Sequence, residues 1–179
     1  MVARLLSASR PFLGIGFTRG FATKSTPSRP LIGRYTEKVP VDLARVQSGK
    51  NVKLRDYETQ KSLKRFSYDL KLQDGIVLPA EGPNFIGPNG CSLREPLSPT
   101  FQEVVRNFRG SDIIVSVIPE GTPLPPTLTI LHEHSDHFSI QCTAPMTLKR
   151  LNEELTDFIT THARTMDKEQ FDEEYPFEL

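Results

Sequence analysis

Short polar segments carry the residues of this chain that could do chemistry. Asn89–Gly90–Cys91–Ser92 places a thiol and a hydroxyl behind a glycine, and Ser135–Ser139 places an acid beside a histidine. Two proline-containing segments accompany them: Asp74–Pro79 precedes the first, and Ile118–Pro125 lies between the two. Hydroxyl and backbone N–H groups at such turns can hold a ligand, so together they predict a polar cleft over a β-core. A phosphate-bearing ligand would suit that cleft.

Nucleophilic catalysis is only weakly indicated by these residues. No Gly-x-Ser-x-Gly pattern surrounds Ser92, and no base is fixed in sequence near Cys91. Two interpretations of the segment remain open. It is either a turn whose hydroxyl and N–H groups hold a ligand or an ordinary Asn-Gly turn.

The histidines invite a metal hypothesis. On a strand, His132 and His134 would share a face, with Glu133 between them. In a continuous strand, however, His137 would face the other side, and no His-Glu-x-x-His helix is present. Both cysteines also lie elsewhere in the chain, so we expect no native metal site.

Two helices and several strands must position these residues. Ser98 followed by proline predicts a helix start, and Phe101, Val104, Val105 and Phe108 recur at helical spacing up to Gly110. We expect Val104 and Phe108 in the core. Thr147 can cap a final helix whose apolar stripe closes the core; the stripe comprises Leu148, Leu151, Leu155, Phe158 and Ile159. The strand candidates are residues 41–46, 113–118, 128–131 and 138–142.

Length and composition favour one globular domain. The chain has 179 residues, of which 37% are hydrophobic, enough for a single ordinary core. Its two cysteines are too few for a disulfide framework, which indicates a reducing compartment. Its longest apolar stretches fall far short of the roughly 20 residues that a membrane span needs, so we expect no span.

Charge is segregated along the chain. The first 36 residues carry six basic and no acidic side chains, and they are rich in hydroxyl and apolar residues. This composition predicts a mitochondrial transit peptide and linker over residues 1–36, with the matrix as destination; Arg19–Ala22 also resembles a matrix-peptidase cleavage pattern. The alternative is a basic arm that binds nucleic acid. Residues 165–179 are acidic and predict a solvated tail, and the basic, aromatic segment 50–71 is either a solvated face or a nucleic-acid surface.

The order of these motifs resembles the toxin domain of type VI secretion effector two and its fungal relatives. The resemblance covers about Leu43 to Ala163 and is specific in Ile118–Leu128 and Asp136–Met146. It implies a single α+β domain over residues 37–164, with a mixed or antiparallel β-core like that of ADP-ribosyltransferase toxins and flanking helices. It also implies NAD as the substrate.

Site residues follow from the resemblance. The family's hydroxyl pair falls on Cys91 and Ser92, its histidine on His137, and its leading arginine on Arg45; a cysteine thus replaces a threonine, and Ala44 replaces an aromatic residue. The implied catalytic residues are Ser92, His137 and Arg45. The implied NAD-binding residues are Arg45, Gly90, Cys91, Ser92, Asp136, His137 and Gln141. A glutamate that stabilises the oxocarbenium ion is not assigned; Glu133 and Gln141 would share a face with His137 in a straight strand.

Three functions are compatible with this pattern. The first is an NAD-dependent ADP-ribosyltransferase or NAD glycohydrolase of the toxin type that acts in mitochondria. Its acceptor would be an unidentified macromolecule, and a protein inhibitor or partner would fit the toxin type. The second is a catalytically silent interaction module with the same fold. The third is an accessory structural protein of a mitochondrial complex.

Overall fold

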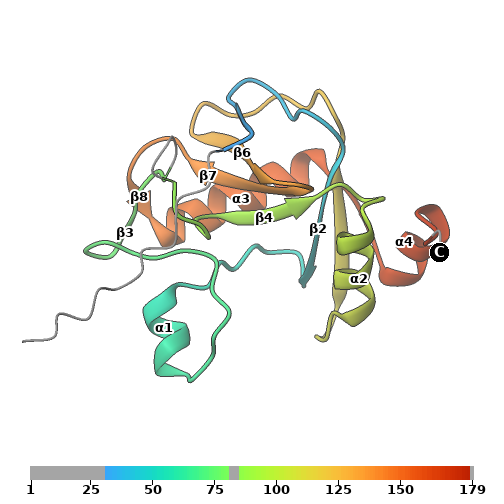
Figure 1. Ribbon diagram of the computed structural model, residues 1–179, viewed down its shortest axis with the longest axis horizontal. Helices are drawn as coiled ribbons and strands as arrows, with labels where there is room; N and C mark the ends of the chain where they lie inside the picture. The colour runs from blue at the N-terminus through green and yellow to red at the C-terminus, as the bar shows by residue number, and fades with distance from the viewer. Residues whose placement is uncertain (1–30, 81–84, 178–179) are drawn as a thin grey trace, which may run out of the picture.

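A seven-stranded antiparallel sheet organises residues 31–80 and 85–177, the part of the chain that the computed structural model describes (Figure 1). Its strand order is β1-β6-β7-β4-β2-β5-β9, and β3 and β8 form a separate pair. The strands are β1 Gly33–Tyr35, β2 Leu43–Ser48, β3 Ile76–Val77, β4 Cys91–Arg94, β5 Ile113–Ile118, β6 Leu128–His134, β7 His137–Cys142, β8 Met146–Thr147 and β9 Arg164–Met166. The helices are α1 Tyr57–Ser62, α2 Pro99–Asn107, α3 Leu148–His162 and α4 Lys168–Glu174.

This arrangement confirms the predicted α+β class and its largely antiparallel β-core. The sheet begins at Gly33, inside the segment expected to be leader and linker, because β1 pairs with β6. The remainder of the predicted leader, residues 1–30, lies outside the described residues. Within residues 31–80 and 85–177, no helix has the length and apolar character needed to cross a bilayer.

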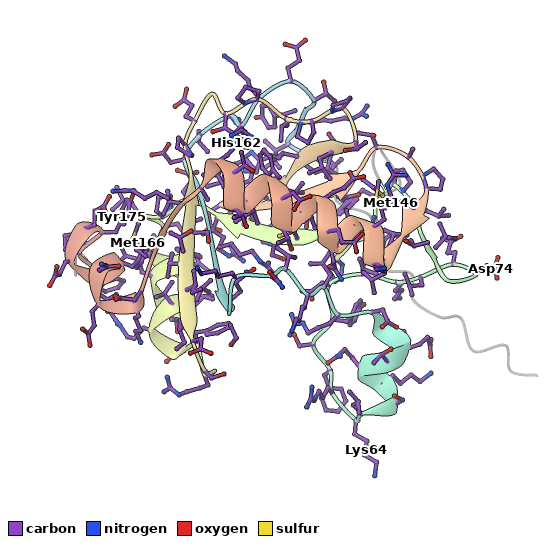
Figure 2. All side chains as sticks on the ribbon, turned by 180° about the vertical axis from the view of Figure 1, so that it is seen from behind. Lys64, Asp74, Met146, His162, Met166 and Tyr175 are labelled. Carbon is purple, nitrogen blue, oxygen red and sulfur yellow. The ribbon has the colours of Figure 1, made fainter. Side chains whose placement is uncertain are left out.

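Helix α3 covers one face of the sheet, as its apolar stripe predicted. The Thr147 hydroxyl caps it by accepting a hydrogen bond from the Arg150 N–H, and Leu151 and Leu155 are fully buried in a core that also contains side chains of β4 and β7. Each buried leucine contributes roughly 1.5–3 kcal/mol of hydrophobic stabilisation. Figure 2 shows α3 from behind, with Met146 just before its start and His162 at its end.

Helix α2 packs on the opposite face. The prediction that Val104 and Phe108 lie in the core was wrong. Its cap at Ser98 is as expected, whereas Phe101 and Val105 are buried and Val104 is 41% exposed. Phe108 is the C-terminal cap and has an extended backbone, so it leaves the helix before it could continue the stripe. Positions i and i+4, counted from Phe101, therefore define the buried face.

The acidic C-terminal segment also departs from the expected solvated tail. Strand β9 pairs with β5, and α4 starts with a capping box between Asp167 and Gln170. Phe171 is 1% exposed and lies edge-to-face against Phe101 of α2. The high content of acidic residues led us to expect a tail and not this short amphipathic helix. Its one buried aromatic residue, Phe171, faces the domain, and its charged side chains face solvent.

Strands β2 and β4 diverge at the centre of the sheet. Strand β2 pairs with β5 along its whole length, but with β4 only through Ala44 and Arg94. The chain between β2 and β3 leaves the sheet and carries α1, which projects from the body of the domain with Lys64 at its tip (Figures 1 and 2). The divergence leaves backbone and side-chain groups of β2 and β4 facing one another across a gap.

Candidate functional site

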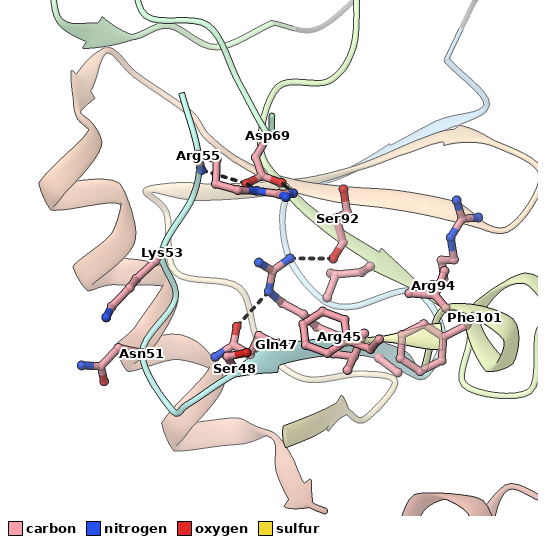
Figure 3. Close-up of a pocket in the computed structure, with 15 residues that line it drawn as sticks. Arg45, Gln47, Ser48, Asn51, Lys53, Arg55, Asp69, Ser92, Arg94 and Phe101 are labelled. Carbon is pink, nitrogen blue, oxygen red and sulfur yellow. Dashed lines mark hydrogen bonds and ion pairs between the residues drawn. The ribbon is translucent and has the colours of Figure 1, made fainter. Parts of the chain in front are cut away.

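A cavity of about 410 Å³ lies where β2 and β4 diverge (Figure 3). Its volume is within the range of ligand pockets, roughly 300–1,000 Å³. Four cationic side chains and one carboxylate line it, together with polar and apolar groups. The charged residues are Arg45, Lys53, Arg55, Arg94 and Asp69, and the uncharged lining includes Gln47, Asn51, Ser92, Phe101 and Phe108. The excess of positive charge favours an anionic ligand.

Arg45 is held in the middle of this cavity by two hydrogen bonds. Its Nη1 donates to the backbone carbonyl of Ser92 at 3.1 Å, and its Nε donates to Oε1 of Gln47 at 2.9 Å. Figure 3 shows its side chain reaching from β2 toward Ser92. The carbonyl of Ser92 accepts this bond because β4 has already separated from β2, so Arg45 bridges the two strands.

Arg55 and Asp69 form a second fixed pair at the rim. Nε and Nη2 of Arg55 donate to the two carboxylate oxygens, each at 2.8 Å, and the Arg55 backbone N–H also donates to Oδ2. The hydrogen bonds from Asp69 raise the pKa of the Arg55 guanidinium. The carbonyl of Asp69 accepts from the N–H of Gly90, so this pair links the segment that carries α1 to the start of β4.

The backbone requires glycine at position 90. Its φ of +149° is disfavoured for other residues, and a Cβ atom there would lie 2.4 Å from the carbonyl oxygen of Ile140. Because β4 begins here in close contact with β7, glycine is the residue that allows the approach. Directly after this turn, Cys91 pairs with Ile140 as the first residue of β4.

Cys91 and Ser92 face opposite sides of β4, so they cannot act as a pair on one ligand. The Cys91 side chain is fully buried in the core beneath α3, where burial raises the pKa of its thiol. Cys91, one of the residues predicted to bind NAD, therefore directs its side chain away from the cavity. Ser92 is partly exposed and lines the cavity.

A polar strip continues from the cavity onto β7. We use this name for Ser92, Arg94, His137, Ser139 and Gln141. Ser92 pairs with Ser139 and Arg94 with His137, so these side chains project from the same face of adjacent strands. Directly opposed Cβ atoms lie about 4.5–5.5 Å apart. The structure thus brings the predicted Ser92, His137 and Gln141 onto one face, next to the cavity that contains Arg45.

His137 is oriented by a buried glutamate. Its Nδ1 lies 3.0 Å from Oε2 of Glu133, and the two side chains are 13% and 7% exposed. Burial acts to raise the pKa of Glu133, but hydrogen bonds from His137 and Ser139 outweigh it, and the net pKa is lowered. An ionised carboxylate only accepts, so this contact assigns the proton to Nδ1 and leaves Nε2 of the neutral ring able to accept a hydrogen bond. The two residues meet across the β6–β7 turn, not along a straight strand.

Asp136 supports Arg94 instead of facing the cavity. It forms an ion pair with Nη1 of Arg94, and its Oδ1 also accepts from the hydroxyl of Ser135. Partial burial raises its pKa, but hydrogen bonding to Ser98 and the charge of Arg94 lower it more, so the net shift is downward. Asp136, predicted to bind NAD, is thus paired with an arginine of the polar strip in this structure.

Gln141 fastens a loop onto the polar strip. It is 1% exposed, and its Oε1 accepts from the backbone N–H of Ala80 at 3.1 Å and from Nδ2 of Asn89 at 3.0 Å. Its Nε2 donates to Ser139 at 3.4 Å. These contacts give Gln141 a positioning role, since its polar atoms are already used within the protein.

The histidines do not form the His132–His134 strand pair that the metal hypothesis considered. A register irregularity between His132 and His134 breaks their common face, and His132 instead stacks on Phe138 at 4.1 Å. Glu133, His134 and His137 come together, with their donor atoms within 4.8 Å of one another.

Several residues of the site were missed in the sequence. Arg94 could have been found, because it lies two positions after Ser92 on a strand and must share its face. Gln47 follows Arg45 by the same rule. Lys53, Arg55 and Asp69 lie in the basic segment 50–71, but the sequence did not place them at this cavity, because their approach depends on the course of the irregular segment between β2 and β3.

Comparison with protein families gives one match. The model of the Tse2 ADP-ribosyltransferase toxin matches residues 41–171, well over half of the chain. The match runs from just before β2 into α4, so it includes the cavity, the polar strip and part of the C-terminal segment that was expected to be a tail. No curated protein matches the chain.

Proposed function

Because the chain belongs to the Tse2 ADP-ribosyltransferase toxin family, we propose that it cleaves NAD between nicotinamide and ribose and transfers ADP-ribose to an acceptor. In this reaction the glycosidic C–N bond breaks and its electron pair leaves with nicotinamide. A nucleophile of the acceptor forms the new bond to ribose and loses its proton. With water as acceptor the same chemistry is NAD glycohydrolysis.

The observation that carries this proposal is the junction of a cationic cavity with the polar strip. NAD has an anionic pyrophosphate between two nucleosides, and the cavity offers Arg45 and Lys53 to such a group. Ser92 stands at the boundary, where a ribose attached to that pyrophosphate would lie. The pyrophosphate of NAD would thus lie in the cationic cavity, and its nicotinamide ribose would lie along the polar strip.

Residue roles follow from this placement. Arg45 binds a phosphate, Ser92 holds the nicotinamide ribose, and Nε2 of His137 bonds a ribose hydroxyl or the carboxamide. The breaking bond leaves positive charge on the ribose, which fixed dipoles and negative charge stabilise. Glu133 is a positioning residue in this scheme, since it orients His137 through Nδ1 and places a carboxylate behind it. It is our candidate for the glutamate that the sequence left unassigned.

A second candidate is the catalytically silent module, and one observation favours it. Each arginine of the cavity is already engaged: Arg45 by Gln47 and Ser92, Arg55 by Asp69, and Arg94 by Asp136. In that case the cavity binds NAD or a partner without turnover. A structural role in a larger complex is the remaining alternative.

We also propose that the protein acts in mitochondria, in the matrix. This part rests on the basic, hydroxyl-rich and acid-free composition of residues 1–36.

Incubation of the full chain with NAD labelled in the adenylate part tests the proposed reaction. Transfer predicts nicotinamide release together with label on protein or nucleic acid, and hydrolysis predicts release with free ADP-ribose. Saturable NAD binding without release would support the silent module instead. The absence of binding at about millimolar NAD would exclude both uses of the cavity.

A further inference from the structure

The tip of the β6–β7 hairpin gathers three side chains with metal-binding donor atoms. Glu133 and His134 end β6 and His137 begins β7, with only Ser135 and Asp136 between them. Ser135 has a φ of 39°, and the register shifts between His132 and His134. The tight turn and the irregularity together bring the three donors within 4.8 Å of one another.

We propose that Glu133, His134 and His137 form a binding site for Zn²⁺. Two imidazoles and one carboxylate are a ligand set that zinc takes in tetrahedral sites, with water completing the fourth position. Tetrahedral bonds of about 2.1 Å put neighbouring donors about 3.4 Å apart. Nδ1 of His137 and Oε2 of Glu133 are already 3.0 Å apart, and the imidazole proton moves to Nε2 when Nδ1 binds the ion.

His134 has to move only slightly to complete the set. The separation of its donor atom from the other two is at most 4.8 Å, so the atom must approach by at most about 1.4 Å to reach the tetrahedral value. Its side chain is exposed and its ring is nearly parallel to that of His137, at 5.1 Å between centroids. A change of its side-chain torsion angles, which gives up the 3.3 Å contact between Nδ1 and the Ser135 hydroxyl, provides this movement while the backbone of the hairpin stays in place.

The buried carboxylate gives independent support. Glu133 is only 8% exposed, yet its Oε1 has no hydrogen-bond partner among the described residues. An unsatisfied oxygen on a buried group is unfavourable, because the water that it loses on burial is not replaced. A cation at the hairpin tip supplies the missing interaction and offsets the charge of the carboxylate.

Occupancy by zinc would inhibit the reaction, an inference that rests on the proposed function. The ion takes the carboxylate and the imidazole that the reaction uses, and it places two positive charges beside a ribose that is itself becoming positive. The site would therefore be regulatory, with the metal-free protein as the active form.

Calorimetric titration of the chelator-treated full chain with ZnCl₂, without NAD, tests the site itself. One equivalent should bind, and Glu133→Gln and His134→Ala should each weaken binding at least tenfold. His132→Ala is the matched control, since this histidine is on the same hairpin but stacks on Phe138, and its affinity should stay within twofold. Visible absorption with CoCl₂ should give the same ranking.

Three results would overturn the proposal: no saturable binding at about 100 μM metal, unchanged binding by His134→Ala, or an equal loss in His132→Ala. Because His134 is on the surface, its variant should keep the wild-type melting temperature, which separates loss of a ligand from loss of the fold.

NAD turnover tests the inhibitory role separately. Saturating zinc should lower wild-type turnover at least tenfold and leave the turnover of His134→Ala nearly unchanged. Undiminished turnover by the zinc-saturated wild type would contradict inhibition. A protein without any NAD turnover would contradict the proposed function and this inhibitory role, while the calorimetric result would still decide whether the metal site exists.

Discussion

Phe171→Ala measures how far the acidic C-terminal segment belongs to the folded domain. The ring is 1% exposed, lies 5.5 Å from that of Phe101 at an interplanar angle of 84°, and stacks on Tyr175 at 5.0 Å. Truncation of a buried phenylalanine costs about 3–5 kcal/mol, because transfer free energy is lost and a cavity remains. That loss is a large part of the 5–15 kcal/mol that typically stabilises a domain.

Denaturant titration of the full chain provides the assay. The midpoint should fall while the slope stays constant, as expected for a loss of stability without a change in the surface exposed. Phe66→Ala is the matched control, since Phe66 is 98% exposed and its removal should change stability by less than about 0.5 kcal/mol.

A double-mutant cycle with Phe101→Ala isolates the ring contact. The sum of the stability losses of the two single variants should exceed the loss of the double variant by about 0.5–1.5 kcal/mol, the usual interaction energy of an edge-to-face pair. A loss below about 1 kcal/mol for Phe171→Ala would refute the packing of α4 on α2, and additive losses would refute the contact between the rings.

Three further predictions concern the turn, the acid dependence and the leader. Gly90→Ala should destabilise the domain by at least about 1 kcal/mol in the same titration, because the added Cβ meets the carbonyl of Ile140 and the φ is strained; wild-type stability would contradict the geometry of this turn. Asp136→Asn should lower the denaturation midpoint at pH 7, and its difference from the wild type should shrink progressively below about pH 4. The lowered folded-state pKa of Asp136 stabilises the protein above the ordinary carboxyl pKa, and that contribution disappears as pH falls through the folded value; a difference that stays constant down to pH 2 would contradict it. Residues 1–36 fused to a fluorescent protein should enter mitochondria, and glutamate at three basic positions should prevent entry; a cytosolic wild-type fusion would contradict the leader. The three positions are Arg4, Arg10 and Arg19.

The elements that were predictable are those whose signal is local. Helix α3 has an unbroken apolar stripe and a capping threonine, so its start and its buried face were both evident. Helix α2 shows the limit of periodicity, because Phe108 fits the spacing but lies where the helix has already ended. Helix α4 was missed because the segment is mostly charged, and a single buried aromatic residue, Phe171, is enough to hold the helix against the domain.

The site was predictable in part for a similar reason. Resemblance to a family identified Ser92 and His137, and the structure places them on one face of adjacent strands. Strand alternation alone could have separated Ser92 from Cys91, since neighbours on a strand face opposite sides. The pairing of Glu133 with His137 depends on a tight turn, and the pairing of Arg55 with Asp69 depends on the course of an irregular segment. Neither pairing follows from residue type and spacing.

The proposed cleavage of NAD at the polar strip is tested by the rate of nicotinamide release by the wild type and by His137→Ala. His162→Ala is the matched control, since that histidine ends α3 and does not contribute to the polar strip. We expect measurable release by the wild type and the control. His137→Ala should lose at least about tenfold in rate, equivalent to about 1.4 kcal/mol of transition-state stabilisation, at an unchanged melting temperature. Equal rates for the wild type and His137→Ala, or no release by a folded wild type, would contradict it.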